Sequence, residues 1–317
     1  MELDEYQRLA SATDDRVPEG MEGLRVLLLG VVGEAGSAAS EAKKSYRDVE
    51  NPHAQEEAPP WVAELICEEL GDMLWYMAAV ARRLGRDLGA VAADNLEKTS
   101  ELWRRELPPP APYDDGFPEE QSLPRRFTVL FDEDATGTVP VVRMRPHDHA
   151  LRRRIVAFRE RKPSVLGADQ IGDTVDDNAR DDIGYRFHDV LHLAHAAVLG
   201  WSPVFRSLTG SKRKADGEFD RVQDGARAIA IEEGLAAFVF NYAEERGFRV
   251  DDEQLDWTLV KHIRRTVRGL EVADAPALAW GRAYAQAFDV FLRLRETGGG
   301  LVSADLDDRT LTFSPAV

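Results

Sequence analysis

A proline-rich segment about one third of the way along the chain is the feature that most constrains the fold. It reads ELPPPAPYDDGFPEEQSLP at residues 106–124. Each proline fixes φ and removes an amide donor, so neither a helix nor a central strand can continue through this segment. A chain of 317 residues is also longer than most single domains. We therefore expect a helical domain at residues 1–106, a linker at residues 107–126 and a second domain at residues 127–317.

Apolar periodicity predicts a mainly α protein. In the first domain, apolar residues recur at helical spacing from Leu24 to Lys44 and from Trp61 to Leu84, and a third helix runs from near Asp87 through Trp103. The second domain is expected to be mostly helical, with a small antiparallel β-sheet if its two hairpins pair. Its expected helices are Tyr185–Leu199, Ala226–Arg246, Asp256–Leu270 and Pro276–Arg295, and its expected hairpins lie at 126–144 and 301–313.

Charge and composition argue against two classes of partner. The formal net charge of −17 repels nucleic-acid backbones and anionic membranes. The basic run Lys212-Arg213-Lys214 interrupts this balance, and we interpret it as loop solvation rather than a binding patch. The sequence contains no run of 18 apolar residues, so we expect no membrane-spanning helix. The acidic N-terminus does not resemble a secretory signal. The single cysteine, Cys67, suits a reducing cytoplasm, which is the expected location.

The segment EELGDMLWYM, residues 68–77, places unusual charge in an apolar helix. On a helical wheel, Glu68, Glu69, Asp72 and Tyr76 share one side, with Trp75 beside them. A solvated outer face is the simplest interpretation. The two aromatic rings favour instead a pocket lined by carboxylates, in which Glu69 and Asp72, three residues apart, converge on one Mg²⁺ ion.

A second helix offers a partner for this acidic face. The sequence VVGEAGSAASEAKK, residues 31–44, places Glu34, Ser37 and Glu41 on one side, and its small residues allow a close approach between helices. Glu34 could then face Glu69 and Asp72 across the helix pair. The alternative is that these are exposed acids on a surface helix.

These segments together resemble the MazG-like all-α nucleoside triphosphate pyrophosphohydrolases. The resemblance covers residues 3–105 through LDEYQRLASAT, LLLGVVGEAGSAASEAKK, ICEELGDMLWYMAAVARRLG and DNLEKTSELWRR. The family signature is Glu-x-x-Glu on one helix and Glu-x-x-Asp on the next. Glu34, Glu69 and Asp72 match it, whereas Ser37 stands at a usual Glu position, for which Glu41 is a possible substitute.

The resemblance implies Mg²⁺-dependent, or alternatively Mn²⁺-dependent, cleavage of a nucleoside triphosphate into a monophosphate and pyrophosphate. It implies Glu34, Glu69 and Asp72 as metal ligands, and relatives commonly assemble, so a homodimer or higher oligomer is expected. Glu68 or Glu69 would orient or deprotonate the attacking water. The expected substrate-binding residues are Asn95 and Lys98, which match a polar pair of the family, and Trp75 and Trp103, which could stack on the base.

The C-terminal half carries a second group of metal-ligand residues. In YRFHDVLHLAHAAVLGW, residues 185–201, His188, His192 and His195 fall on one face of a helix, a spacing used for transition metals. Glu232 and Glu233 could approach them from another helix, although structural histidines remain an equal alternative. The aspartates of GDTVDDNARDD, residues 172–182, are interpreted as caps and turn residues. This half also resembles the C-terminal extension that follows MazG-like domains in some bacterial and phage proteins.

Three functions therefore compete. The first is a pyrophosphohydrolase that acts on nucleoside triphosphates. The second is a two-site enzyme with a separate metal-assisted hydrolase at the histidines. The third is a non-catalytic nucleotide-binding regulator, in which Ser37 marks a weakened site.

Overall fold

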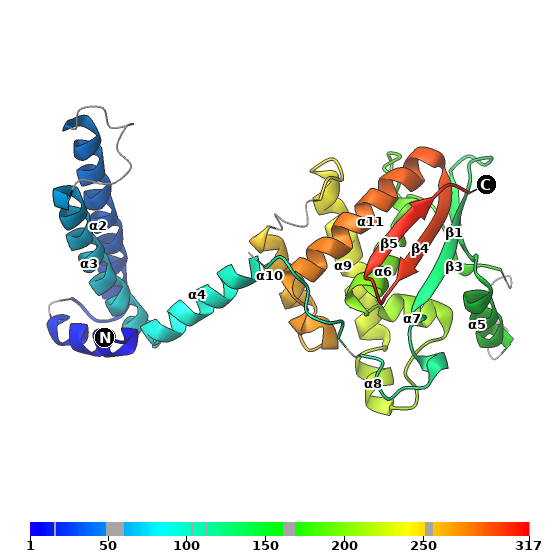
Figure 1. Ribbon diagram of the computed structural model, residues 1–317, viewed down its shortest axis with the longest axis horizontal. Helices are drawn as coiled ribbons and strands as arrows, with labels where there is room; N and C mark the ends of the chain where they lie inside the picture. The colour runs from blue at the N-terminus through cyan, green and yellow to red at the C-terminus, as the bar shows by residue number, and fades with distance from the viewer. Residues whose placement is uncertain are drawn as a thin grey trace. The chain divides into compact units, whose positions relative to one another are not determined.

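The computed structural model describes residues 1–15, 17–48, 60–102, 104–111, 113–160, 169–250 and 256–316. The chain divides into two compact units, Met1–Ser100 and Glu101–Val317 (Figure 1). The predicted fold class is confirmed, because the structure is mainly helical and carries a five-stranded antiparallel sheet in the C-terminal unit. The proline-rich segment belongs to the second unit, where the Arg206 guanidinium pairs with Asp114 and Arg154 donates to the carbonyl of Ser122.

The N-terminal unit is built on two long helices that lie side by side. Its elements are α1 (Leu3–Ala10), the 3₁₀ turn η1 (Ser11–Thr13), α2 (Gly20–Asp48), α3 (Pro60–Arg83) and α4 (Leu88–Leu102). Gln7 ties α1 to the α3–α4 corner, because its side chain donates to the carbonyls of Ala78 and Arg86 and accepts from the amide of Leu88.

Helix α2 combines a long apolar stretch with a largely exposed surface. Its stretch Gly20–Lys44 has a mean hydropathy of 1.2, and only 11% of the window is buried. By length and composition alone, it is the one stretch among the described residues that could cross a membrane. Core helices of soluble proteins pass the same test, and a charged Glu34 would be costly in lipid. The expectation that no segment spans a membrane stays a prediction.

The sheet of the C-terminal unit joins two hairpins that are far apart in the sequence. Its order is β3-β2-β1-β4-β5, and β1 pairs with β4 so that Val129 lies opposite Val302. The two predicted hairpins therefore form one sheet. The strands are β1 (Arg126–Asp134), β2 (Val141–Pro146), β3 (Ile171–Val175), β4 (Gly299–Asp305) and β5 (Thr310–Ser314).

Helices cover this sheet and form the main core. They are α5 (His149–Glu160), α6 (Val190–Ala194), α7 (Pro203–Thr209), α8 (Gly217–Val222), α9 (Ala226–Glu244), α10 (Trp257–Thr266) and α11 (Ala277–Thr297), with 3₁₀ turns η3 (Glu119–Gln121), η4 (Tyr185–Phe187) and η6 (Glu271–Asp274). Helix α11 buries Trp280, Tyr284, Phe288 and Phe291 against the rest of this core.

The predicted helix at residues 185–199 is not one regular α-helix. It consists of the turn η4, the short helix α6 and a π-helical segment, η5 (His195–Leu199). A π segment widens the backbone spiral, so α-helical spacing does not give the directions of all the side chains. The sequence reading also missed strand β3 and helices α5, α7 and α8.

The interpretation of the basic run Lys212-Arg213-Lys214 as solvated loop residues is wrong for Arg213. It is fully buried rather than solvated, and it forms ion pairs with Asp224 and Glu271. Its Nη1 also donates to the carbonyl of Tyr113. Only Lys214 of the run is exposed, so the run provides little surface charge.

Asp177 fits its predicted role as a turn residue, and it is buried. It accepts the amides of Gly184 and Arg186 and pairs with the Arg186 guanidinium at 2.9 Å. Burial raises the pKa of Asp177, but these three contacts outweigh burial and hold the pKa below its ordinary value of 3.8.

Replacing Asp177 with Asn should lower the free energy of unfolding by about 2 kcal/mol at pH 7. A depressed folded pKa means that the contribution of the carboxylate is present above the unfolded pKa and is lost as pH falls through the folded pKa. The difference between wild type and variant should therefore shrink below pH 3.8. Urea unfolding across this range measures it, with exposed Asp181→Asn as the control. A difference that stays constant with pH would contradict the assignment.

Candidate functional site

The acidic face of α3 is turned toward α2. Single ligand oxygens from Glu34, Glu69 and Asp72 all lie within 4.8 Å of one another. Glu34 and Glu69 are half-buried and Asp72 is exposed. The structure therefore brings together the three residues predicted as metal ligands. The exposed face of α3 instead carries apolar residues such as Leu70 and Met77.

A close contact between the two helices sets this geometry. Gly30 lies one turn before Glu34 on α2, and a Cβ added there would lie 2.2 Å from the Tyr76 ring. The missing side chain thus lets the Tyr76 ring lie directly against α2. Gly33 and Gly36 on the same helix have open space around them, so neither of them needs to lack a side chain as Gly30 does.

Crowded carboxylates give the cluster a preference for cations. Partial desolvation raises the pKa of Glu69, and the carboxylates of Glu34, Asp72 and Glu68 raise it further. A bound cation relieves this repulsion. Oxygen-only ligands on one accessible face suit Mg²⁺ or Mn²⁺, which keep several waters when bound to proteins.

The carboxylate cluster does not include three other polar residues of these two helices, Glu68, Ser37 and Glu41. Glu68 is exposed on α3, and Ser37 is half-buried on α2. Glu41 pairs with Lys44, and it does not join the group formed by Glu34. The structure therefore shows no substitute at the position where Ser37 departs from the family pattern, as far as the described residues reach.

Three of the residues predicted to bind substrate, Trp75, Asn95 and Lys98, lie on α3 and α4. The Trp75 indole donates to the hydroxyl of Thr13 in η1, and its ring meets Tyr76 edge-on. Asn95 is exposed and Lys98 is half-buried on α4. Among the described residues, no hydrogen bond or ion pair joins either of them to Glu34, Glu69 or Asp72. Trp103 lies outside the described residues.

The C-terminal unit brings its histidines and glutamates together around one buried carboxylate. Glu232 accepts hydrogen bonds from the Nδ1 atoms of His192 and His195, both at 3.0 Å, and from Ser202 at 2.8 Å. Burial raises the pKa of Glu232, but the two histidines outweigh burial and lower the pKa to about 2. Burial lowers the pKa of His192, but Glu232 and Glu233 outweigh burial and raise it well above its ordinary value.

One residue of this region was not among the metal ligands predicted from the sequence. Asp189 lies beside His188 and His192, and ligand atoms of the three residues lie within 4.8 Å of one another. The signal was present as His-Asp-x-x-His, because residues at i, i+1 and i+4 can share one end of a helix.

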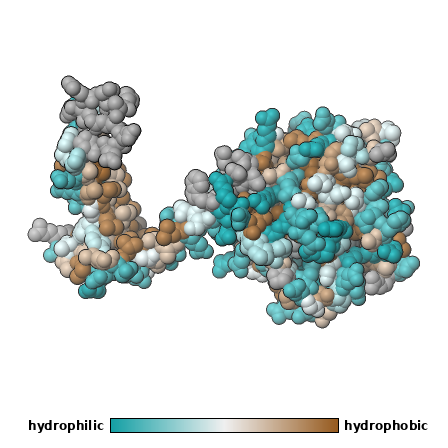
Figure 2. All heavy atoms as spheres, viewed as in Figure 1, coloured by the Kyte–Doolittle hydropathy of each residue, from teal (hydrophilic) through white to brown (hydrophobic). Residues whose placement is uncertain are grey.

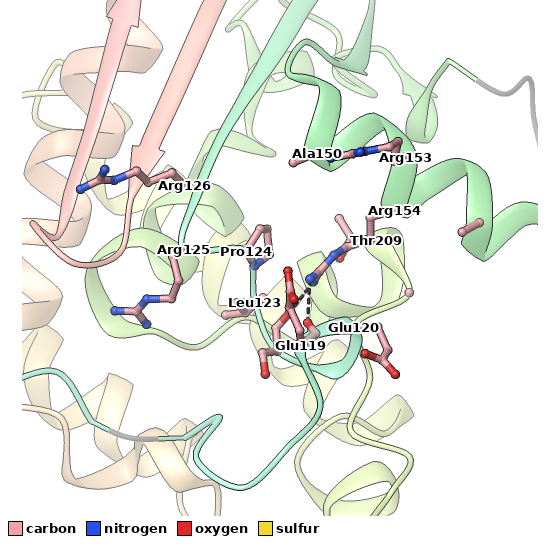
Figure 3. Close-up of a pocket in the computed structure, with 13 residues that line it drawn as sticks. Glu119, Glu120, Leu123, Pro124, Arg125, Arg126, Ala150, Arg153, Arg154 and Thr209 are labelled. Atoms are coloured by element: carbon pink, nitrogen blue, oxygen red, sulfur yellow. Dashed lines mark hydrogen bonds between the residues drawn. The ribbon is translucent and has the colours of Figure 1, made fainter.

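An arginine-rich cavity of about 600 Å³ lies elsewhere in this unit (Figure 3). Three of its four arginines are already engaged: Arg125 pairs with Asp307, Arg126 pairs with Asp305, and Arg154 donates to the carbonyls of Glu119 and Ser122. Arg125 and Arg126 also point away from Arg154 in Figure 3. These three arginines therefore offer little free positive charge to an anion.

Comparison with known proteins places the chain in a family. The model of the MazG C-terminal domain matches residues 108–317, and the chain belongs to the family that carries this domain. This match confirms the predicted C-terminal extension. The chain is also similar to the gene 37 protein of Mycobacterium phage L5, with 38% identity over 102 residues, or 31% of this chain and 85% of that protein. No solved structure matches the chain.

We call Glu34, Glu69 and Asp72 the carboxylate trio. If the trio binds a divalent cation, Gly30→Ala should weaken that binding. The new methyl group must displace Tyr76 or separate the helices, and a shift of about 1 Å in a polar site costs on the order of 100-fold in function. We expect at least a 10-fold weaker Mn²⁺ affinity by calorimetry. The matched control is Gly36→Ala on the same helix, where a methyl group meets open space. Equal affinities in the two variants would show that the close contact does not set the site.

Proposed function

We propose that the N-terminal unit hydrolyses nucleoside triphosphates to monophosphate and pyrophosphate with the help of a divalent cation. The observation that carries the proposal is the convergence of Glu34, Glu69 and Asp72 from two packed helices. The resemblance of residues 3–105 to MazG-like pyrophosphohydrolases and the MazG C-terminal domain that follows support it.

The protein's own groups have defined roles in this proposal. Glu34, Glu69 and Asp72 would hold Mg²⁺, with Mn²⁺ as the alternative. When bound, the cation supplies positive charge for the phosphates and lowers the pKa of water. Glu69, whose pKa is raised, or exposed Glu68 would accept the proton of the attacking water.

The apolar outer surface of this unit supports a second copy of the chain as its partner. Large exposed side chains follow both long helices: Val26, Leu28, Leu29 and Val32 on α2, and Trp61, Leu65, Leu70 and Met77 on α3. Figure 2 shows hydrophobic side chains gathered along this helix pair. A dimer would cover these apolar side chains. Our proposal also places the protein in the cytoplasm, where it would bind neither membranes nor nucleic acid.

A product assay tests the proposal. The full chain is incubated with a panel of ribo- and deoxyribonucleoside triphosphates and either Mg²⁺ or Mn²⁺, and monophosphate and pyrophosphate are measured together. Equimolar release of the two products, dependent on the cation, is the expected result. Release of diphosphate and phosphate would reject the proposed cleavage site, and nucleotide binding without products would favour the regulator.

A further inference from the structure

We propose that the C-terminal unit holds a divalent transition-metal ion, with His188, Asp189 and His192 as ligands and Glu233 completing the site at its solvent side. This centre lies in a different unit from the carboxylate trio. It does not depend on the activity proposed above.

Hydrogen bonds fix both imidazoles in the form that binds metals. His188 Nδ1 lies 2.9 Å from the carbonyl oxygen of Tyr185, which can only accept, so His188 carries its hydrogen on Nδ1. His192 Nδ1 in turn lies 3.0 Å from the buried Glu232 carboxylate. Both Nε2 atoms therefore keep their lone pairs when the rings are neutral. This arrangement, with the far nitrogen held by a carbonyl or carboxylate, is typical of metal-bound histidines.

Ligand atoms of His188, Asp189 and His192 lie within 4.8 Å of one another, and Glu233 approaches this group through His192. His188 Nε2 lies 3.5 Å from Asp189 Oδ1, and His192 Nε2 lies 4.0 Å from the same oxygen. Glu233 Oε2 lies 3.4 Å from His192 Nε2. Zinc–ligand bonds of about 2.0–2.1 Å place tetrahedral ligand atoms about 3.3 Å apart. The His188 Nε2–Asp189 Oδ1 distance exceeds that value by about 0.2 Å and the His192 Nε2–Asp189 Oδ1 distance by about 0.7 Å, and side-chain rotations would close these gaps.

Burial adds an independent observation. His192 is 1% exposed, and its Nε2 atom has no hydrogen-bond partner, although it faces Asp189 and Glu233. A buried polar atom without a partner is costly, and a metal ion at this point removes that cost. The two carboxylates supply the negative charge that a divalent cation needs in a buried site.

A neighbouring combination of residues does not make a better site. His192, His195 and Glu232 also lie within reach of one another, but through the Nδ1 atoms that already donate to Glu232. The oxygens of Glu232 are further occupied by Ser202 and by the amide of Val204. Glu232 is therefore a positioning residue that orients His192, and it is not a ligand.

The ligand set indicates the kind of ion. Two imidazoles with carboxylates favour Zn²⁺, Fe²⁺ or a similar first-row ion over Mg²⁺ and Ca²⁺, which prefer oxygen alone. The Glu233 side chain is 46% exposed, so the site has a side open to solvent. Displacement of Glu233 from the metal would open a ligand position there to water or a substrate oxygen.

Metal titration of the full chain tests the assignment. The EDTA-treated protein is titrated with Zn²⁺ by calorimetry and with Co²⁺ by visible absorption, in the wild type and in Asp72→Asn. Because Asp72→Asn impairs the carboxylate trio, one equivalent of Co²⁺ with nitrogen-ligand bands should remain in that variant. Such a result would show that Co²⁺ binds at the histidine centre independently of the site in the N-terminal unit.

Ligand variants give the decisive comparison. His188→Gln and the isosteric Asp189→Asn should weaken Zn²⁺ binding by more than about 100-fold, beyond the 10- to 100-fold effect of outer partners. Glu232→Gln should weaken it within that smaller range and shift the Co²⁺ bands, a change that a purely structural role would not produce. The matched control is His147→Gln, an exposed histidine of the same unit.

Thermal unfolding in EDTA establishes that each variant is folded before metal is added. The proposal is overturned if folded Asp189→Asn and His188→Gln bind Zn²⁺ as tightly as the wild type. It is equally overturned if the EDTA-treated wild type shows no Co²⁺ bands from nitrogen ligands.

Discussion

Asp72→Asn should lower the kcat of triphosphate hydrolysis by about 100- to 1000-fold. The substitution keeps the size of the side chain but removes the negative charge that holds a cation beside Glu34 and Glu69. The loss of charge stabilisation by a poorly held metal is worth several kcal/mol, and about 1.4 kcal/mol corresponds to each factor of ten in rate. Steady-state pyrophosphate release across a range of Mg²⁺ concentrations measures the effect.

The control for this variant is Glu64→Gln, which neutralises an exposed acid of the same helix outside the trio. Its rate should stay within about twofold of the wild type, because a lone surface charge contributes little. If Asp72→Asn and Glu64→Gln were equally active, the trio would not be the catalytic centre.

Arg213→Ala should destabilise the C-terminal unit by about 3–5 kcal/mol, because it leaves the nearly buried Glu271 without its paired cation and the fully buried Asp224 carboxylate with only the longer contact to Arg206, at 3.8 Å. The Tyr113 carbonyl also loses the hydrogen bond that it accepts from the Arg213 guanidinium, which adds to the effect. For a unit of this size, the expected fall in Tm is on the order of 10 °C. Calorimetry or circular dichroism of the full chain measures it.

Lys214→Ala is the matched control, because it removes the adjacent positive charge at an exposed position. Its unfolding free energy should change by no more than about 0.5 kcal/mol. Similar Tm values for the two variants would mean that Arg213 is not buried among its partners.

The carboxylate trio was accessible to sequence reasoning because its geometry is local. Glu69 and Asp72 are three residues apart on one helix, and the small residues around Glu34 indicated a close neighbour. Two regular helices then suffice to bring the oxygens together. The resemblance of residues 3–105 to one family pointed to the same residues. The exposure of the apolar face of α3 could not be predicted. An apolar stripe on a helix shows the same sequence pattern whether or not another element covers it.

The features that sequence reasoning missed depend on distant partners or irregular backbone. Arg213 is indistinguishable from its lysine neighbours until Asp224 and Glu271 come into contact with it. The direction of His195 depends on a π segment that begins at this residue and that α-helical spacing does not reproduce. The pairing of β1 with β4 joins segments more than 150 residues apart, and alternation shows only that each is a strand.

This pairing has a consequence for biosynthesis. β1 ends at Asp134, but its partner β4 begins only at Gly299, so one edge of the central strand has no neighbour while the intervening helices are being made. At ordinary translation speeds that interval lasts on the order of 10 s. An unpaired strand edge invites association with other chains. A nascent chain paused before β4 should therefore be the form of this protein that most needs a chaperone.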